Sequence, residues 1–156
     1  MNIEQILKDH KLWFESGGKE GARADLGGAD LRGVDLSCAD LRNANFKGAD
    51  LRWVNFKGAD LKWVNFKGAD LSCANLENAN LRNTKGNDKE IKNIENNIYH
   101  IVYTKKSLLI GCENHLIEEW FKFDDETIEK MDVDALEWWN EYKDGIFKHI
   151  KENPAT

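Results

Sequence analysis

The feature that most constrains this chain is a five-residue period that runs without a gap through its first half. Leu or Phe occurs at every fifth position from 26 to 81, twelve times in all. Ala or Val lies two residues before each of them, and Asp or Asn lies immediately before. The repeating unit is therefore A-(D/N)-(L/F)-x-x.

A period of five suits neither regular element of secondary structure. On a helix, each step of five residues carries the apolar position about 140° beyond a full turn, and in a straight strand it alternates between the two faces. All the Leu and Phe side chains can point inward only if the chain bends once in every unit. Such bending winds the chain into a solenoid, with the Leu or Phe and the preceding Ala or Val inside.

An unbroken tandem array of this unit resembles the pentapeptide-repeat family. The resemblance covers Ala24 to Asn83. It implies a mainly β fold, namely a right-handed, quadrilateral β-helix with four units in each coil. Three such coils, at a spacing of about 4.8 Å, would be only about 14 Å long. Residues twenty apart would stack, so we expect Phe46 to lie on Leu26 and Phe66 to lie on Phe46.

Two bulky residues, Trp53 and Trp63, occupy outward positions of the array, each preceded by a basic residue, Arg52 or Lys62. Ten residues make half a coil, so the two rings should project from opposite faces and cannot form one aromatic ladder. Each ring can either pack against a flanking element or contact a partner, because Trp is enriched at interface hot spots. The pattern leaves both roles open.

The residues before the array predict one amphipathic capping helix within residues 1–18. Its apolar side carries Ile3, Ile6, Leu7, His10, Trp13 and Phe14, with Asn2 as the N-cap and Gly17-Gly18 as the stop. A solenoid exposes apolar side chains and backbone edges at its end, so a cap is physically needed. His10 is a candidate site residue, but a packed helix histidine explains it without a ligand.

The remaining organisation follows from composition. We place the array at 22–84, a polar linker at 85–97, and a tail of a hairpin plus helices at 98–156. The strands of the hairpin are expected in "IYHIVY" and "SLLIG", on either side of residues 104–106. Asp124 should cap a short helix, and Asp134 with Glu137 resembles a capping box for the last one. Trp120 and Trp138 of this tail are candidate partner contacts.

The two flanks extend the family resemblance to nearly the whole chain. "HKLWFESGGKEGARADL" before the array and "IGCENHLIEEW" behind it are similar to pentapeptide-repeat proteins often found in phage and prophage genomes. That resemblance brings no assigned activity, and it implies a host protein as the partner.

Cysteine usage and hydropathy indicate the compartment. Cys38, Cys73 and Cys112 are odd in number and irregular in spacing, which argues against a disulfide framework and suits a reducing environment. No apolar run approaches the roughly 20 residues that cross a bilayer, and the N-terminus lacks the order of a secretion signal. We therefore expect a cytoplasmic protein without membrane contact.

Candidate chemistry is sparse. Cys112 and His115 have a C-x-x-H spacing that could begin a zinc site, but no second ligand pair follows, and a structural turn explains them as well. A Cys-His nucleophile would also need an orienting group and an oxyanion hole. Phosphate loops, paired-histidine metal motifs and nucleophile elbows are missing from the sequence. We expect no enzyme activity, no metal and no cofactor.

Charge bears on nucleic-acid partners. The array's eight acids are matched by eight bases, so a neutral rod about four base pairs long makes a poor DNA mimic. Direct nucleic-acid binding is disfavoured, because each outward base has an acid or amide in its own unit. Acidic mimicry by the tail or by a dimer remains the alternative to a protein-interaction module contacted through Arg52, Trp53, Lys62 and Trp63. Homodimerisation through the hairpin edge or the last helix stays open.

Overall fold

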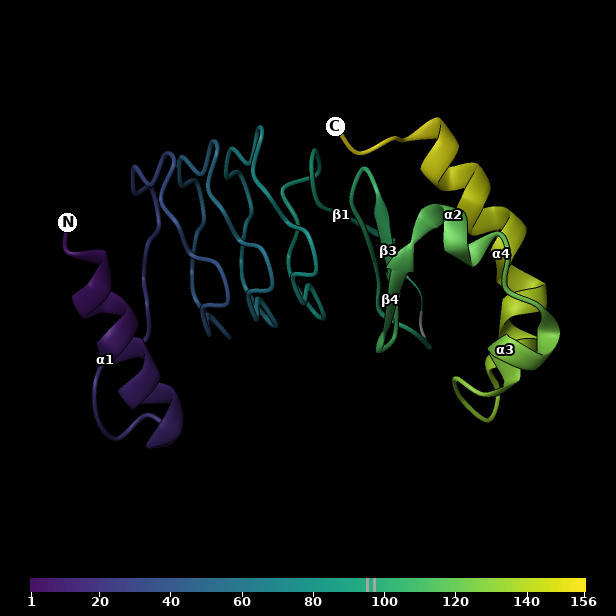
Figure 1. Ribbon diagram of the computed structural model, residues 1–156, viewed down its shortest axis with the longest axis horizontal. Coiled ribbons are helices and arrows are strands. Elements are labelled where there is room, and N and C mark those ends of the chain that lie inside the picture. Colours follow the sequence, from purple (N-terminus) through teal and green to yellow (C-terminus); the bar gives the residue numbers. More distant parts are fainter. Residues whose placement is uncertain (95, 97) are drawn as a thin grey trace.

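The computed structural model describes residues 1–94, 96 and 98–156, and it shows an elongated molecule with the repeat array between an N-terminal helix and a C-terminal layer (Figure 1). Helix α1 spans Ile3–Glu15. As predicted, Asn2 caps it, because its side-chain oxygen accepts the backbone N–H of Gln5 at 3.1 Å. The helix ends before Gly17 and Gly18, both with positive φ, where the Gly18 N–H returns to the Trp13 carbonyl.

The array pairs with itself at a spacing of twenty residues, or four units. Parallel bridges join Asp25 to Asn45, Asp30 to Asp50, and so on up to Asn65 with Lys85. In each unit the residue before the Leu or Phe also uses its side chain, accepting the backbone N–H two residues later, as Asp50 does from Arg52. This local bond explains why the position is always Asp or Asn.

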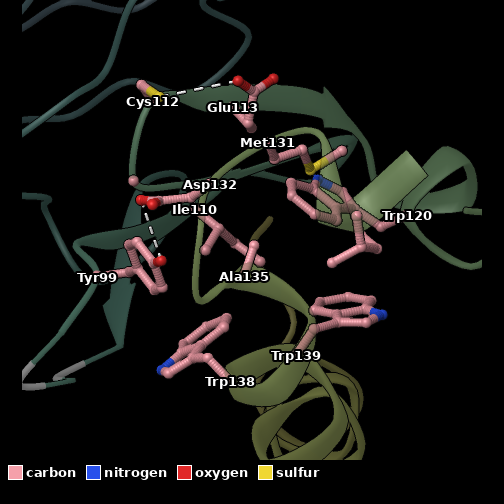
Figure 2. A pocket seen from close by; sticks show the side chains of 12 residues that line it. Tyr99, Ile110, Cys112, Glu113, Trp120, Met131, Asp132, Ala135, Trp138 and Trp139 are labelled. Atoms are coloured by element: carbon pink, nitrogen blue, oxygen red, sulfur yellow. Dashed lines mark hydrogen bonds between the residues drawn. The ribbon is translucent and has the colours of Figure 1, made fainter. Parts of the chain in front are cut away.

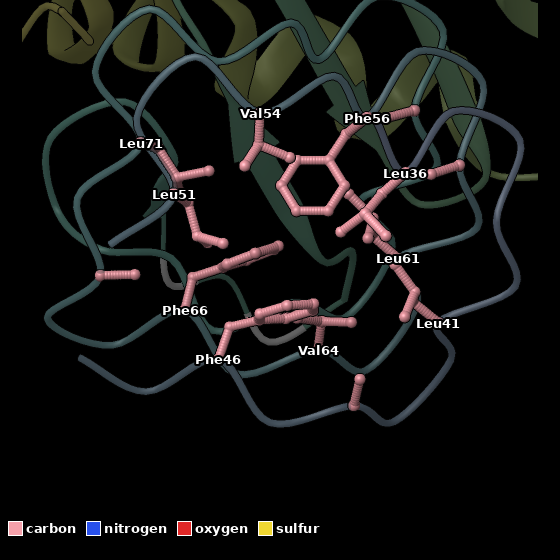
Figure 3. Packing of buried hydrophobic residues seen from close by; sticks show 14 of the residues in the cluster. Leu36, Leu41, Phe46, Leu51, Val54, Phe56, Leu61, Val64, Phe66 and Leu71 are labelled. Atoms are coloured by element: carbon pink, nitrogen blue, oxygen red, sulfur yellow. The ribbon is translucent and has the colours of Figure 1, made fainter. Parts of the chain in front are cut away.

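The inside of the array is filled by the repeated apolar side chains (Figure 3). Phe46 and Phe66 stack with ring centroids 5.6 Å apart and an interplanar angle of 12°, which confirms the predicted ladder. Phe56 meets both rings edge-on. The Asp25–Asn45 bridge places Leu26 in line with Phe46. The small Ala partners are buried beside them, so the units close tightly.

Helix α1 covers the N-terminal end of the array, as the sequence predicted. Ile3, Ile6 and Leu7 pack against the array core. His10 is buried, and its Nδ1 accepts the N–H of Ala24, the first residue of the array, at 3.1 Å. His10 is thus a packed residue that ties the helix to the first unit.

A four-stranded antiparallel sheet covers the other end of the array. Its order is β1-β2-β3-β4, with bounds β1 Lys92–Ile94, β2 Ile101–Tyr103, β3 Ser107–Ile110 and β4 Glu113–Leu116. The β2–β3 hairpin confirms the predicted one. Val102 and Leu109 belong to the array core, whereas Ile101, Tyr103, Leu108 and Ile110 join a second core with the helices. Both faces of the sheet are therefore covered.

The polar linker predicted at 85–97 needs correction. Strand β1 lies within it, Ile91 is fully buried in the array core, and Asn87 and Glu90 are also buried. Positions 95 and 97 of that linker lie outside the described residues. The prediction failed because short polar side chains here bond to the last coil, as the Asn87 amide does to the Ala69 carbonyl, so polarity did not indicate exposure. Strand β4 and helix α2 were also not predicted.

Three helices form the outer layer (Figure 1). They are α2 Ile117–Trp120, α3 Asp125–Glu129 and α4 Ala135–Glu152. Asp124 caps α3 through the Thr127 N–H, as predicted. The capping box at Asp134 was wrong, because this residue has φ −105° and ψ 10° and makes no side-chain capping bond. In the described part of the chain, no helix is long and apolar enough to cross a membrane.

Candidate functional site

Trp53 and Trp63 occupy an unusual backbone position. Both close their units in the left-handed region, with φ of 59° and 64°, where the other units have Gly, Asn or Cys. This conformation is unfavourable for a bulky residue, by about 1–2 kcal/mol. The side chains are also 58% and 59% exposed, so they gain little from burial. Fold stability does not explain these two residues.

Residues twenty apart in the sequence stack along the array, and we call each such stack a column. The register places the rings of Trp53 and Trp63 in separate columns. Trp53 is in line with Gly33 and Cys73, and Trp63 with Asn43 and Asn83, because bridged residues are twenty apart. The two columns are half of that period apart, so the rings cannot join one ladder, as predicted. Both rings are more than half exposed, so packing against a flanking element, one of the two roles left open, does not account for them.

Ion pairs run along the column of Trp53. Arg52 Nη2 lies 2.5 Å from Asp50 Oδ2, and Arg52 Nε lies 3.9 Å from Asp70. The neighbouring Arg32 also reaches Asp50, with Nε 3.6 Å from Oδ2.

These ion pairs lower the pKa values of the carboxyl groups. The bond from Arg52 lowers the pKa of Asp50, and the bond from Arg32 lowers the pKa of Asp30 to about 2. The Arg52 guanidinium also lies 5.6 Å from the Trp53 ring centroid. Trp53 thus stands beside a charge-balanced network.

The column of Trp63 has a similar network and one further neighbour. Lys62 Nζ is 3.1 Å from Asp60, while Arg42 pairs with Asp40 and approaches Asp60 at 3.8 Å. The Phe14 ring of α1 lies under Arg42, 3.5 Å from Cζ to the centroid. Helix α1 therefore occupies the N-terminal end of this side, and Trp63 lies beyond it.

Trp120 and Trp138, predicted as partner contacts, are core residues instead. They are 3% and 5% exposed. Trp120 Nε1 donates to the Leu108 carbonyl at 2.7 Å, and Trp138 packs against Tyr99 with centroids 4.8 Å apart. The prediction failed because the sequence did not show which elements would surround these two rings. In the structure, α4 meets the sheet, α2 and α3 together, so adjacent residues 138 and 139 are both buried.

Cys112 and His115 lie on either side of Glu113 in the sequence, close to the β3–β4 turn. Both contact Glu113, with Cys112 Sγ 3.8 Å from Oε1 and His115 Nε2 3.2 Å from Oε2. The His115 ring packs edge-on against Phe123, with centroids 4.9 Å apart. Within the described ranges, no group of three or more His, Cys, Asp or Glu residues is arranged to hold a metal ion. A structural role at the β3–β4 turn accounts for both residues.

A wide cleft of about 1270 Å³ separates the last coil from the tail, and the sequence did not indicate it. It is lined by Leu71 and residues 73–78 of the array, Glu90, the 104–107 turn, residues 114–119 with Phe121, and Thr156. Phe121, 63% exposed, and Cys73, one register position beyond Trp53, both line it. Because the lining comes from five segments that are separate in the sequence, no local pattern could have predicted the cleft. The Trp53 column therefore leads to this cleft.

Comparison with known proteins agrees with the repeat geometry. The sequence profile described as pentapeptide repeats matches residues 24–62 and 59–85, in eight copies. No curated protein matches the chain.

Several solved structures are similar to part of this chain. Rfr23, a pentapeptide repeat protein from the cyanobacterium Cyanothece 51142, is 28% identical over 42% of this chain and 42% of its own, with a TM-score of 0.37. HetL, a pentapeptide repeat protein involved in heterocyst differentiation regulation in Nostoc sp. strain PCC 7120, is 32% identical over 43% of this chain and 38% of its own, with a TM-score of 0.32.

A pentapeptide repeat protein from the Arabidopsis thaliana thylakoid lumen is 34% identical over 40% of this chain and 50% of its own, with a TM-score of 0.23. In each case, the match spans half or less of the other protein's length. The profile match coincides with the segment whose backbone repeats every twenty residues. Residues 24–85, which make up less than half of the chain, are therefore similar to the pentapeptide-repeat family.

Proposed function

We propose that this protein is a non-enzymatic protein-interaction module that contacts its partner through Trp53 and Trp63. The observation that carries the proposal is the placement of two exposed Trp side chains in a backbone conformation that disfavours them. Strained residues of this kind cluster at functional sites, and Trp is the residue type most enriched at interface hot spots. Pentapeptide-repeat proteins generally act as interaction or structural modules, which supports this assignment.

The Trp53 side is the better candidate for the main contact. It adjoins the cleft, where Phe121 offers a further exposed aromatic ring. Arg52 is already paired with Asp50, so it can orient a partner without presenting an unbalanced charge. Lys62 has the same relation to Asp60 beside Trp63. Both basic residues therefore belong to the proposed surface as rim residues.

The finer features of the proposal extend the family resemblance. We take the array to be a right-handed, four-sided helix of three coils, acting in the cytoplasm. The partner is taken to be a host protein, since the flanks resemble those of phage-associated members. A partner of this kind would bind a rigid rod whose exposed rings are fixed by the backbone, so little conformational entropy would be lost at the contact.

The test is capture of a partner from a bacterial lysate by the wild type and by two variants, Trp53→Asn and Trp63→Asn. Asn suits the left-handed conformation, so the variants should fold at least as well as the wild type. We expect at least one of them to reduce the captured partner about tenfold or more, as for a hot spot. Val133→Asn, at an exposed apolar residue before α4, is the control. Equal capture by all four proteins would overturn the assignment.

A second function is favoured by one observation. Segment 113–144 carries twelve acidic residues against three basic ones. We therefore propose, as the alternative, that the tail or a dimer inhibits a DNA-acting enzyme, such as a topoisomerase or a defence nuclease, by imitating phosphate charge. A gyrase supercoiling assay and a nuclease assay, each with excess protein, test it, and full activity in both would exclude the two named classes. The paired charges of the array give no support to mimicry by the rod itself.

A further inference from the structure

A small cavity lies in the C-terminal layer, away from Trp53 and Trp63 (Figure 2). Its volume is about 40 Å³, and its lining comes from the β3–β4 turn, α2, α3, α4 and the segment between the last two helices. Since one water molecule needs roughly 10–15 Å³ on this measure, the cavity can take the head group of one side chain. It is too small for a nucleotide or a sugar.

The walls of the cavity are aromatic. Trp120 and Trp139 lie with centroids 5.2 Å apart at a tilt of 37°, and Trp138 meets Tyr99 at 82°. Figure 2 shows these rings around a floor that includes Ile110 and Ala135. Aromatic faces attract cations through their quadrupole, and the attraction is stronger where water is excluded.

The rim of the cavity is acidic. Asp132 is exposed and accepts the Tyr99 hydroxyl at 3.2 Å, while Glu113 is half-buried at the opposite turn. None of the described lining residues is basic. The surrounding segment 113–144 contains twelve acidic and three basic residues, so its electrostatic potential favours a cationic ligand.

We propose that this pocket binds the guanidinium group of an arginine side chain presented by a partner protein. A flat guanidinium stacks on aromatic faces and pairs with carboxylates through several N–H groups, and both kinds of contact are available here. A purely apolar side chain would fill the floor but offer no N–H group to the two rim carboxylates, which already contact neighbouring groups of the chain. The pocket is separate from the Trp53 and Trp63 surfaces, although it rests on the same interaction role.

The test titrates the full chain with a capped Gly-Arg-Gly peptide and with the same peptide carrying citrulline, the neutral isostere of arginine. Binding is followed by NMR at the indole N–H signals of Trp120, Trp138 and Trp139. We expect the arginine peptide to shift these signals and to bind about tenfold more tightly than the citrulline peptide. A lysine peptide should bind between the two, because its ammonium lacks the planar fork.

Two matched variants show whether the pocket itself is responsible. Asp132→Asn removes a rim charge but keeps an oxygen that can accept the Tyr99 hydroxyl, and it should weaken arginine binding about fivefold or more. Asp144→Asn removes an equal charge on α4 outside the pocket and should leave the affinity unchanged. Equal binding of arginine and citrulline, or equal losses in the two variants, would overturn the proposal. Because no lysate partner is involved, this result is independent of the capture experiment.

Discussion

The side-chain amide of Asn87 donates to the carbonyl of Ala69 at 3.0 Å. In the earlier coils, the carbonyl at this position accepts a backbone N–H from the next coil, as Ala49 does from Asp70. Asn87 is buried, its own oxygen accepts the Ile91 N–H, and its amide also contacts Glu90. One side chain thus takes the place of the missing coil and turns the backbone toward the sheet.

This relationship predicts a strong effect of Asn87→Asp. The oxygen that replaces the amide nitrogen would face the Ala69 carbonyl and the Glu90 carboxylate without a donor, so we expect a loss of about 3 kcal/mol or more in the free energy of unfolding. Urea unfolding at neutral pH measures it. Asn78→Asp, at an exposed position of the array, is the control and should have a much smaller effect. Similar losses at both sites would show that Asn87 has no special role.

The buried position of Trp120 predicts that its truncation affects folding before any binding. Trp120→Ala should lower the free energy of unfolding by about 3–5 kcal/mol. Trp120→Phe keeps most of the packing but removes the donor to Leu108, and should cost about 1–3 kcal/mol. Thermal or urea unfolding distinguishes the two variants. An unchanged stability of Trp120→Ala would restore this residue as a surface contact.

Substitution of the exposed Trp residues should increase stability, in contrast to substitution of Trp120. Trp53→Asn and Trp63→Asn should each raise the free energy of unfolding, by about 1 kcal/mol, because Asn tolerates the left-handed backbone. Asn43→Trp, in the column of Trp63 and with φ 67°, is the reverse substitution and should lower it by a similar amount. The same urea titrations provide the measurement. If Trp53→Asn and Trp63→Asn lowered stability, the rings would have a structural role in the array.

Three glycines predict three different outcomes on substitution by Ala. At Gly21, a Cβ would lie 2.1 Å from the Asp9 carbonyl oxygen, so Gly21→Ala should separate α1 from the array and cost about 3 kcal/mol or more. At Gly48 the space is open and only the positive φ of 68° opposes Ala, for about 1 kcal/mol. Gly145 lies in α4 with open space around it, so Ala should stabilise by about 0.5–1 kcal/mol. A different order of the three stabilities would contradict the account of the α1 junction.

His10 predicts a pH dependence of stability. Burial lowers its pKa below the ordinary 6.5, partly offset by Asp40. The unfolded chain therefore binds a proton at this site before the folded chain does. The stabilising contribution is present above pH 6.5 and is lost as the pH falls from there through the lowered folded pKa.

Urea unfolding across this range, in the wild type and in His10→Gln, tests the pH dependence. Gln supplies an oxygen for the Ala24 N–H but does not titrate, so the variant should lose less stability on acidification. His100 is half-buried and also has a pKa lowered by burial, and His100→Gln serves as the parallel case. An identical pH profile for wild type and His10→Gln would show that His10 is not responsible.

Structural features that arise from neighbouring residues could be predicted from the sequence, whereas features that arise from tertiary contacts could not. Each unit of the array contains its own bend, with an Asp or Asn that bonds two residues on, so the period alone predicted the buried Leu and Phe positions. The Asn2 and Asp124 caps were equally local. By contrast, the burial of Trp138 depends on the sheet and α3, and the role of Asn87 depends on Ala69, eighteen residues away. Neither relation appears as a periodic pattern in the sequence.

The same distinction applies to the candidate site, where the exposed Trp residues could be predicted and the cavities could not. Trp53 and Trp63 stood out because they break a repeat, and that repeat also specifies their backbone conformation. The cleft and the aromatic pocket were missed because their residues come together only through tertiary packing. Apolar composition in the tail indicated that it packs against something, but it could not tell which ring would be inside.

The twenty-residue spacing of the bridges has a consequence for how such a protein can change in length. Inserting or deleting four units keeps α1 and the β1–β4 sheet in the same rotational phase about the axis, and changes only the distance between them. Any other number of units would turn one end relative to the other. The number of repeats therefore sets the direction in which the cleft faces with respect to α1, and a rod of this kind can present its two ends to partners in only a few discrete orientations.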